Sequence, residues 1–427
     1  CPTNCCYLGE SVFKLGEPVL KFITILLCVA QVVHASDWPQ WLGPNRDCHA
    51  ALQSTEIATL ASQPKVIWRK AIGGGFSSPV IAAAKVVYFD EDGTNEVAHE
   101  LEASTGKELW KTAIGDVYKD EWSPGPRATP IIDGDRVYVQ SCKGEFRCLD
   151  SKTGKVQWGF SFEKDFGVKF LGSRAREGTA ARRGNNGTGI VDGDAVLVPV
   201  GSTDNATIVC FDKKTGKQLW RSGTDEAAYS SLHVATITGV RQVIMLDADA
   251  LIGVDRTNGH LLWRVPFHTD AKRHAATPVI NGDNVIVNSH TIGIVAVHIQ
   301  KTGTGFEAKR AWTNPSLTIN LSTPVLVDGY LYSQGPSRNF ICADARTGEL
   351  KWEAPGFGRE NSSTISVGKN LFVLTDAGEL VLVAATPTAY KELGRQQVCG
   401  KNWNFPAFAD GKLYVRDARE LTCIQLE

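Results

Sequence analysis

The sequence lacks the short motifs by which many enzymes are identified. It contains no G-x-S-x-G elbow, no Walker loop, no dinucleotide-binding fingerprint and no EF-hand loop. It also has no C-x-x-C pair, and none of its nine histidines has the spacing of a metal ligand in a helix or hairpin. We therefore expect no metal site and assign no catalytic residue, so the motifs favour a protein that is not an enzyme.

An excess of charge of one sign is also absent. Lys and Arg number 45 against 46 Asp and Glu, which gives a formal net charge of −1. A chain this close to neutrality has no overall field to attract nucleic acid or an anionic membrane. We expect no nucleic-acid partner, and any binding must come from local patches.

Methionine and long hydrophobic runs are scarce. Met245 is the only methionine, and the apolar run Phe22–Val33 is shorter than a transmembrane helix requires. Lys21 precedes this run and Val33-His34-Ala35 resembles a cleavage site. We expect residues 1–35 to combine an over-extended start with a signal peptide, a buried terminal element being the alternative. The mature chain is then exported, soluble, without a membrane span, and periplasmic or extracellular.

Seven cysteines follow Ser36, and four of them share one repeat position: Cys148, Cys210, Cys342 and Cys423. We expect these four to be small buried hydrophobic residues. An oxidising compartment would permit one disulfide among Cys48, Cys142 and Cys399, or a pair between Cys142 and Cys148.

A phrase of the type Asp-x-x-Thr-Gly-Lys-x-x-Trp recurs along the chain. Copies or close variants end at Trp110, Trp158, Trp220, Trp263 and Trp352. Recurrence at a period of roughly 40–60 residues indicates a repeat architecture, and the strand patterns favour a propeller. We expect these tryptophans, with Trp68 and Trp312, to pack between neighbouring blades rather than to bind a ligand.

Each unit predicts four antiparallel strands. A Ser/Thr-Pro-Val-Ile strand is followed by an Asp-Gly or Asn-Gly hairpin turn, two further strands and the Trp strand. Eight units open near Ser78, Thr129, Thr188, Ser231, Thr277, Thr323, Ser363 and Phe405. The fifth contains an irregular stretch at 302–312.

The chain is therefore predicted to be all-β, an eight-bladed propeller of four-stranded blades over residues 64–427, preceded by an N-terminal segment at 36–63. The last unit ends after three strands, so the strand near Trp68 should supply its fourth and close the ring.

The loops before the innermost strands should converge at one mouth of the central channel. Their candidate ligand-binding residues are Arg127, Asn185, Asn186, Tyr229, His274, Asn320, Glu360, Asn361, Trp403 and Asn404. Arginine binds carboxylate or phosphate, amides donate and accept, and aromatic rings stack on flat ligands. The set suits a small planar or anionic ligand or a peptide. Alternatively, it holds ordered water.

An insert at 160–184 separates the second and third units. It carries Arg174, Arg176, Arg182 and Arg183. A long irregular segment of this kind is usually functional or solvated, so the insert is either a basic lid beside the mouth or a solvated loop.

The repeat phrase, preceded by Ser/Thr-Pro-Val-x-x-x-Gly, resembles the pyrroloquinoline quinone (PQQ) repeat over about residues 37–427. The resemblance implies an eight-bladed propeller like those of quinoprotein alcohol dehydrogenases and of a lipoprotein of the outer-membrane barrel-assembly machine. The Asp37–Arg46 opening is also similar to exported bacterial PQQ-like propellers.

The dehydrogenases use a vicinal Cys-Cys ring and a calcium ion, whereas the only adjacent pair here is Cys5-Cys6. We therefore expect a monomeric, non-catalytic scaffold with a protein or cell-envelope partner and no cofactor. The alternatives are a divergent PQQ- and calcium-dependent dehydrogenase and a small-ligand or glycan binder at the mouth.

Overall fold

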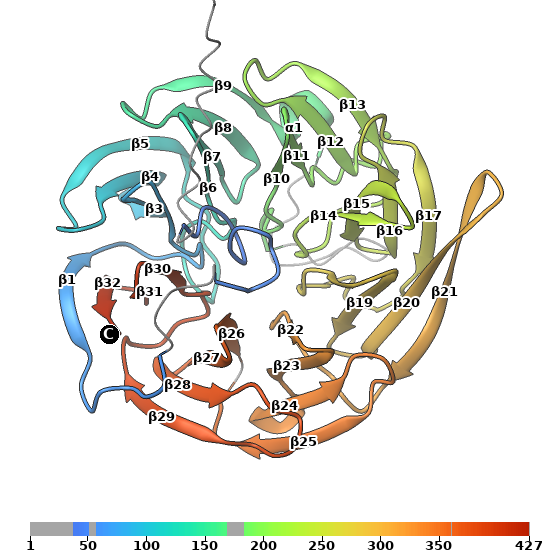
Figure 1. The fold of residues 1–427 in the computed structure, drawn as a ribbon. Helices are drawn as coiled ribbons and strands as arrows, with labels where there is room; N and C mark the ends of the chain where they lie inside the picture. The colour runs from blue at the N-terminus through green and yellow to red at the C-terminus, as the bar shows by residue number, and fades with distance from the viewer. Residues whose placement is uncertain (1–36, 51–56, 169–182, 360, 427) are drawn as a thin grey trace, which may run out of the picture. The chain divides into compact units, whose positions relative to one another are not determined.

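The computed structural model describes residues 37–50, 57–168, 183–359 and 361–426. In these residues, 32 β-strands form eight four-stranded antiparallel sheets arranged as blades around a central axis (Figure 1). The predicted eight-bladed, all-β propeller is confirmed. The expected signal peptide at 1–35 lies outside the described residues. Among the residues that are described, no helix is long and apolar enough to cross a membrane.

The blades follow one another around the ring in chain order (Figure 1). Blade 1 has β2 (Val80–Ala82), β3 (Lys85–Asp92), β4 (Asn95–Glu102) and β5 (Glu108–Asp116); blade 2 has β6 (Ile131–Asp133), β7 (Arg136–Gln140), β8 (Glu145–Asp150) and β9 (Val156–Ser161). Blade 3 has β10 (Ile190–Asp192), β11 (Ala195–Val198), β12 (Ile208–Asp212) and β13 (Gln218–Ser222); blade 4 has β14 (His233–Ile237), β15 (Val240–Leu246), β16 (Ala250–Asp255) and β17 (Leu261–Pro266). Blade 5 has β18 (Val279–Asn281), β19 (Asn284–Ser289), β20 (Gly293–Thr302) and β21 (Gly305–Asn314); blade 6 has β22 (Val325–Val327), β23 (Tyr330–Gln334), β24 (Asn339–Asp344) and β25 (Leu350–Pro355). Blade 7 has β26 (Ser362–Val367), β27 (Asn370–Thr375), β28 (Glu379–Ala384) and β29 (Glu392–Gln397); blade 8 has β30 (Ala407–Ala409), β31 (Lys412–Arg416), β32 (Glu420–Gln425) and β1 (Lys65–Ala71).

The ring is closed by pairing the two ends of the described propeller. β1 is the outermost strand of blade 8 and runs antiparallel to β32, with Trp68 opposite Cys423. This is the predicted closure by the strand near Trp68. It removes the free edge that a three-stranded last blade would expose.

The repeated tryptophans join neighbouring blades. The indole N–H of Trp158 in blade 2 donates to the backbone carbonyl of Lys213 in blade 3. Five other tryptophans bond the next blade in the same way, at 2.8–3.2 Å: Trp68, Trp110, Trp220, Trp312 and Trp352. The rings also pack on the next Thr-Gly turn, where a Cβ on Gly216 would lie 2.6 Å from the Trp158 ring. Glycine is therefore required by contact as well as by its positive φ.

The repeat cysteines lie in the same rows as these tryptophans. Cys148 pairs with Trp158, Cys210 with Trp220 and Cys342 with Trp352, and all four repeat cysteines are fully buried. All seven cysteines of the described residues carry free thiols. The disulfides considered among Cys48, Cys142 and Cys399, or between Cys142 and Cys148, are therefore not formed.

Blade 5 departs from the prediction. The stretch expected to be irregular at 302–312 is a regular hairpin, in which β20 and β21 pair from Ile294↔Asn314 to Thr302↔Gly305. Each strand is ten residues long and continues beyond the blade (Figure 1). Polar residues of the outer half, such as the exposed Lys301 and Lys309, make the alternation of a strand hard to recognise in the sequence.

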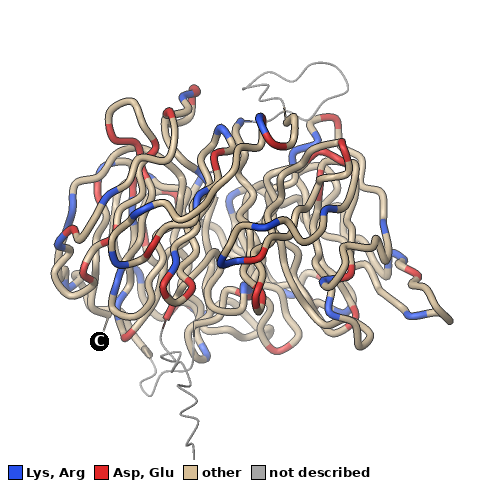
Figure 2. Tube along the Cα trace, turned by 90° about the horizontal axis from the view of Figure 1, so that it is seen from above, with Lys and Arg blue, Asp and Glu red and all other residues tan. Residues whose placement is uncertain are grey.

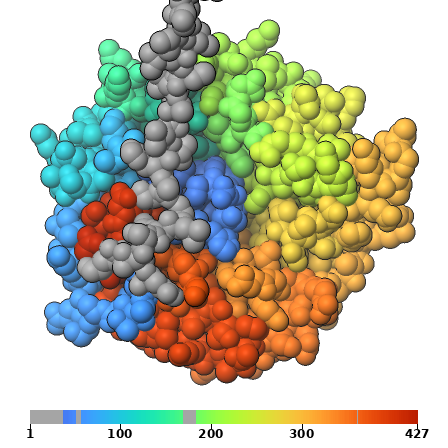
Figure 3. All heavy atoms as spheres, in the orientation of Figure 1, coloured from blue at the N-terminus to red at the C-terminus, as the bar shows by residue number. Residues whose placement is uncertain are grey.

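The N-terminal residues 37–50 lie inside the ring, where Figures 1 and 3 show them at its centre in blue. Trp38 bridges Ile81 of blade 1, and His49 bridges Ser366 of blade 7. The guanidinium of Arg46, which is 1% exposed, donates to backbone carbonyls of Thr188 and Leu232. A segment that contacts opposite sides of the ring fills the channel between them.

The positions of basic and acidic residues are interspersed along the side of the ring (Figure 2).

The described start of the predicted insert at 160–184 is regular: β9 ends at Ser161, which caps the short helix α1 (Phe162–Phe166). Arg174, Arg176 and Arg182 lie outside the described residues, whereas Arg183 is described.

Candidate functional site

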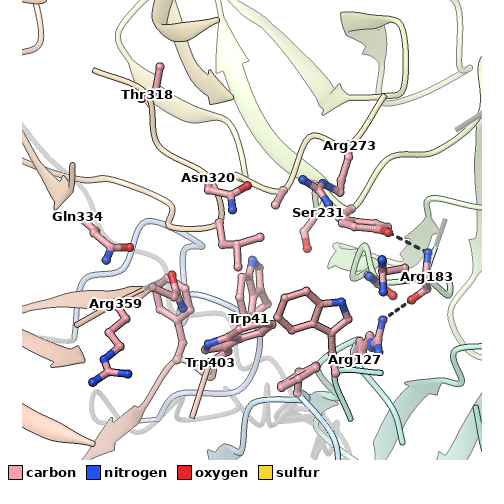
Figure 4. A pocket seen from close by; sticks show the side chains of 18 of the residues that line it. Trp41, Arg127, Arg183, Ser231, Arg273, Thr318, Asn320, Gln334, Arg359 and Trp403 are labelled. Carbon is pink, nitrogen blue, oxygen red and sulfur yellow. Dashed lines mark hydrogen bonds between the residues drawn. The ribbon is translucent and has the colours of Figure 1, made fainter. Parts of the chain in front are cut away.

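A pocket of about 630 Å³ occupies the mouth of the channel (Figure 4). The loops before the innermost strands of several blades surround it, and Trp41 of the N-terminal segment reaches it from inside the ring. Its lining includes Trp41, Phe76, Trp122, Arg127, Arg183, Asn186, Tyr229, Arg273, Asn320, Gln334, Arg338, Arg359, Asn361, Trp403 and Phe405. The channel is therefore a pocket rather than an open pore at this end.

Most of the residues predicted for the mouth line this pocket. They are Arg127, Asn186, Tyr229, Asn320, Asn361, Trp403 and, from the insert, Arg183. Asn185, His274 and Asn404 are 8%, 0% and 2% exposed and do not belong to the lining. Their neighbours face the pocket while they point into the blades. Glu360 lies outside the described residues.

Several lining residues were not predicted. Trp41 comes from a segment that has no repeat. Trp122 lies in the loop before β6, five positions before Arg127, and Arg338 lies between β23 and β24 of blade 6. Arg273 precedes the predicted His274 by one residue, and Arg359 precedes Glu360 in the same way. Extending the repeat alignment by one position would have found these two, but no repeat pattern indicates the other three.

The serine and threonine residues that open the units have a structural role at the mouth. The backbone N–H of Ser78 donates to the hydroxyl of Thr129, and that of Thr129 donates to the hydroxyl of Thr188. The same bond joins Thr188 to Ser231, Thr277 to Thr323 and Phe405 to Ser78, at 3.0–3.1 Å. These hydroxyls tie adjacent blades together and so hold the mouth loops at fixed spacing.

Arg127 is held firmly at one side of the mouth. Its guanidinium lies 2.7 Å from the Asp120 carboxylate and 5.4 Å above the Phe76 ring. Burial alone would raise the pKa of Asp120, but the hydrogen bond and charge of Arg127, together with the backbone N–H groups of Trp122 and Ser123, leave the pKa below its usual value. The pair is ionised, and the charge of Arg127 is largely compensated.

The loop that carries Arg127 rests on a buried carboxyl group. Glu96, which is 0% exposed, accepts hydrogen bonds from the backbone N–H groups of Tyr118 and Cys142. Burial raises the pKa of Glu96 to about 7, although these two bonds and Arg127 act in the opposite direction. Glu96 lies behind the lining and positions two mouth loops.

Arg183 is placed by four contacts. Its guanidinium pairs with Glu121 and lies 5.8 Å from the Trp122 ring, and its backbone N–H donates to the Tyr229 hydroxyl. Its backbone carbonyl accepts from Arg127 (Figure 4). The first described residue after the gap in the insert is thus built into the rim of the pocket.

The guanidinium groups of three further arginines line the pocket. Among the described residues, no carboxylate forms an ion pair with Arg273, Arg338 or Arg359, and the lining contains no Asp or Glu. Of the three, only the backbone N–H of Arg359 meets a described carboxylate, that of Asp376 at 2.9 Å. The Nε–H of Arg273 is buried and has no hydrogen-bond partner among the described residues. Uncompensated guanidinium groups around one opening attract anions.

Aromatic rings form the apolar part of the lining. Phe76 and Trp403 stack with their centroids 5.1 Å apart, and Trp122 lies 5.1 Å from Trp403 on a tilted plane. Trp122 is 48% exposed, and the Nε1–H of Trp403 is buried without a partner. We call Phe76, Trp403 and Trp122 the aromatic cluster.

In the described part of the mouth, no side chains are grouped for acid–base catalysis or for metal binding. His274 is buried behind the lining, and burial lowers its pKa to about 4. In the described part of the chain, no three His, Cys, Asp or Glu side chains are grouped so that they could hold a metal ion. The arrangement suits binding by guanidinium, amide and aromatic groups.

Comparison with known proteins identifies the family. The profile of the family described as "Outer membrane protein assembly factor BamB" matches residues 53–165 and 171–386. A BamB of Yersinia pestis is 21% identical over 317 residues, which cover 73% of this chain and 76% of that protein. A polyvinylalcohol dehydrogenase of Sphingopyxis is 32% identical over 245 residues, covering 51% of this chain and 32% of the relative.

A solved structure of similar fold is a quinohemoprotein alcohol dehydrogenase of Pseudomonas putida. It aligns with a TM-score of 0.63 at 12% identity and covers 92% of this chain and 80% of that one. Such a likeness shows a shared fold and not a shared activity. With the family profile matching well over half of its length, this chain belongs to the PQQ-repeat propeller family described as outer membrane protein assembly factor BamB.

Proposed function

We propose that this chain is a non-catalytic binding propeller of the cell envelope that holds a negatively charged ligand or partner segment at its channel mouth. One observation carries the proposal: three of the five arginines that line the pocket, Arg273, Arg338 and Arg359, form no ion pair with a described carboxylate, and the described lining contains no Asp or Glu. A volume of about 630 Å³ lies within the range of pockets that enclose small ligands. The family description, an assembly factor of the outer membrane, supports a place in the envelope.

The calcium-held quinone of the dehydrogenase relatives does not fit this mouth. Calcium binds six to eight oxygen ligands, with carboxylates among them. The described lining offers amide oxygens from Asn186, Asn320, Gln334 and Asn361, but no carboxylate, and it surrounds them with guanidinium groups that repel a cation. We therefore derive no oxidation step for this chain.

The proposal can be tested with a pair of small aromatic probes. Tryptophan fluorescence would be followed while the full chain is titrated with benzene-1,3,5-tricarboxylate or with the neutral benzene-1,3,5-tricarboxamide. We expect saturable quenching by the tricarboxylate, weakened by added salt, because Trp41, Trp122 and Trp403 line the pocket.

Arg273→Ala should weaken binding of the tricarboxylate, whereas Arg346→Ala, on an exposed Thr-Gly turn of blade 6, serves as the matched control. Equal responses to the two probes, or equal effects of the two substitutions, would contradict an anion site at the mouth.

A further inference from the structure

Within the described lining of the pocket, the buried side-chain atoms that have no hydrogen-bond partner are all donors. They are the Nε–H groups of Arg127 and Arg273 and the Nε1–H of Trp403. Buried donors without acceptors are costly, so a ligand that supplies oxygen acceptors would be favoured there. Arg338 and Arg359 of the same lining form no ion pair with a described carboxylate.

The lining has few acceptors to offer in return. The Oδ1 of Asn361 already accepts a 2.7 Å bond from the Ser322 hydroxyl, and the amide of Gln334 bonds Ser322 and the carbonyl of Phe357. Asn320 is exposed and forms no side-chain hydrogen bond among the described residues. A bound peptide brings a backbone N–H with nearly every residue, and this donor-rich wall would leave many of them unpaired.

A sugar chain offers a different set of groups to this wall. Each hydroxyl oxygen can accept a hydrogen bond from an arginine while its O–H rotates towards solvent or a neighbouring sugar oxygen, whereas a peptide N–H can only donate. The C–H face of a pyranose also packs on an aromatic ring. The exposed Trp122 of the aromatic cluster provides such a ring beside the arginines. Carboxylates on the sugar would pair with Arg273 and Arg359, since guanidinium binds carboxylate in a bidentate manner.

We propose that the mouth binds an acidic oligosaccharide, a short chain of uronic acid residues, through the aromatic cluster and through Arg273 and Arg359. This inference rests on the proposed function and specifies its ligand. Exposed Asn320 is placed to bond sugar hydroxyls, and the pocket, at about 630 Å³, takes a few sugar units rather than a long chain.

The test compares one sugar chain in two charge states. The full chain would be titrated calorimetrically with oligogalacturonate, with its fully methyl-esterified and therefore neutral form, and with an N-acetylated tetraglutamate amide. We expect the acid form to bind and the ester to bind at least about tenfold more weakly, since charge-assisted bonds are lost.

Variants locate the site. Arg359→Ala and Trp122→Ala change exposed side chains and should each weaken oligogalacturonate binding about tenfold while the melting temperature stays unchanged. Arg346→Ala should have no effect on either quantity. Equal binding of acid and ester, or binding unaffected by both mouth variants, would overturn the inference.

The choice of ligands also distinguishes a failure of this inference from a failure of the proposed function. Binding of tetraglutamate that depends on Arg359, without binding of the sugar, overturns the saccharide and leaves the anion-binding mouth supported. Absence of binding by the sugar, the peptide and benzene-1,3,5-tricarboxylate overturns both.

Discussion

The indole Nε1–H of Trp41 donates a 2.9 Å hydrogen bond to the hydroxyl oxygen of Thr277, 236 positions further along the chain. The corresponding hydroxyl oxygens of other blades accept instead from a backbone N–H of the preceding blade; they belong to Ser78, Thr129, Thr188, Ser231 and Thr323. Among the described residues, no such bond joins blade 4 to blade 5, and the indole of Trp263 bonds Gln242 of its own blade. The N-terminal segment thus contacts the ring where two of its regular ties are missing.

Removing the buried guanidinium of the N-terminal segment should destabilise the whole propeller. Arg46→Met removes the side-chain donor from the buried carbonyls of Gly189 and Leu232, at roughly 1–3 kcal/mol for each unsatisfied group, whereas the Thr188 carbonyl keeps its bond from the Leu232 N–H. We expect a loss of about 3 kcal/mol in the free energy of unfolding, measured by urea denaturation. Asn45→Ala, at the exposed neighbouring position, should change it by less than about 0.5 kcal/mol. Equal effects would show that the segment does not stabilise the ring.

The contact between glycine and tryptophan at the blade seams makes a second prediction. Gly216→Ala places a Cβ 2.6 Å from the Trp158 ring at a φ of +71°, so it should lower the free energy of unfolding by about 3 kcal/mol or more. Gly282→Ala has a similar φ of +60° with no atom within 4 Å of the new Cβ, so it should lower the free energy of unfolding by about 1 kcal/mol. Thermal unfolding followed by circular dichroism compares them. A similar melting temperature for both variants would leave backbone strain as the only cost.

Acid should destabilise the protein partly through His274. Burial lowers the pKa of His274 to about 4, below the value of about 6.5 in an unfolded chain, so protons bind preferentially to the unfolded state between these values. Its contribution to stability is present above pH 6.5 and is lost as pH falls towards 4.

The measurement is the free energy of unfolding at pH 7 and pH 4 for the wild type and His274→Gln. We expect the difference between the two proteins to change by roughly 2–3 kcal/mol across this interval, in favour of the variant at low pH. Parallel pH profiles would mean that His274 is not kept neutral by its burial.

The free thiols predict a pattern of chemical modification. Cys148, Cys210, Cys342 and Cys423 are fully buried, and burial raises the pKa of the half-buried Cys399 to about 12. Because the thiolate is the reactive form, iodoacetamide should leave the seven described cysteines almost unmodified in the native protein at pH 8. Without reductant, unfolding in urea should expose all seven cysteines from Cys48 to Cys423 to alkylation, as seen by peptide mass spectrometry. A cysteine that stays unmodified in urea would reveal a disulfide.

The repeat made the fold predictable because each unit carries its own local signals. The Asp-Gly turns, the alternating strands and the Trp phrase are encoded within about 50 residues, and eight copies leave little freedom in how they are arranged. The closing strand followed from the same logic, since the last unit lacked its outer strand and residues around Trp68 matched it. The hairpin of β20 and β21 was missed because polar residues dominate its outer half, where only Ile299, Phe306 and Ala308 face the core.

The mouth was predicted only where it belongs to the repeat. Aligning the units brought Arg127, Asn186, Tyr229, Asn320, Asn361 and Trp403 to one place, and all of them line the pocket. The alignment could not separate lining from buried neighbours, because a side chain's direction there depends on loop conformation. Asn185 points to the carbonyl of Cys142, and His274 to the hydroxyl of Ser289.

By itself, the sequence determined the class of fold, the number of blades, the closure of the ring and the tryptophan seams, since all of these depend on short-range patterns that repeat. Tertiary structure alone decided that Trp41 reaches the mouth from within the channel, and that Arg273, Arg338 and Arg359 line it without carboxylates among the described residues. These features join segments far apart in the chain, and their charge balance depends on which side chains meet. No local sequence pattern specifies contacts between such distant segments. They form only when the ring closes and brings the loops of different blades to one mouth.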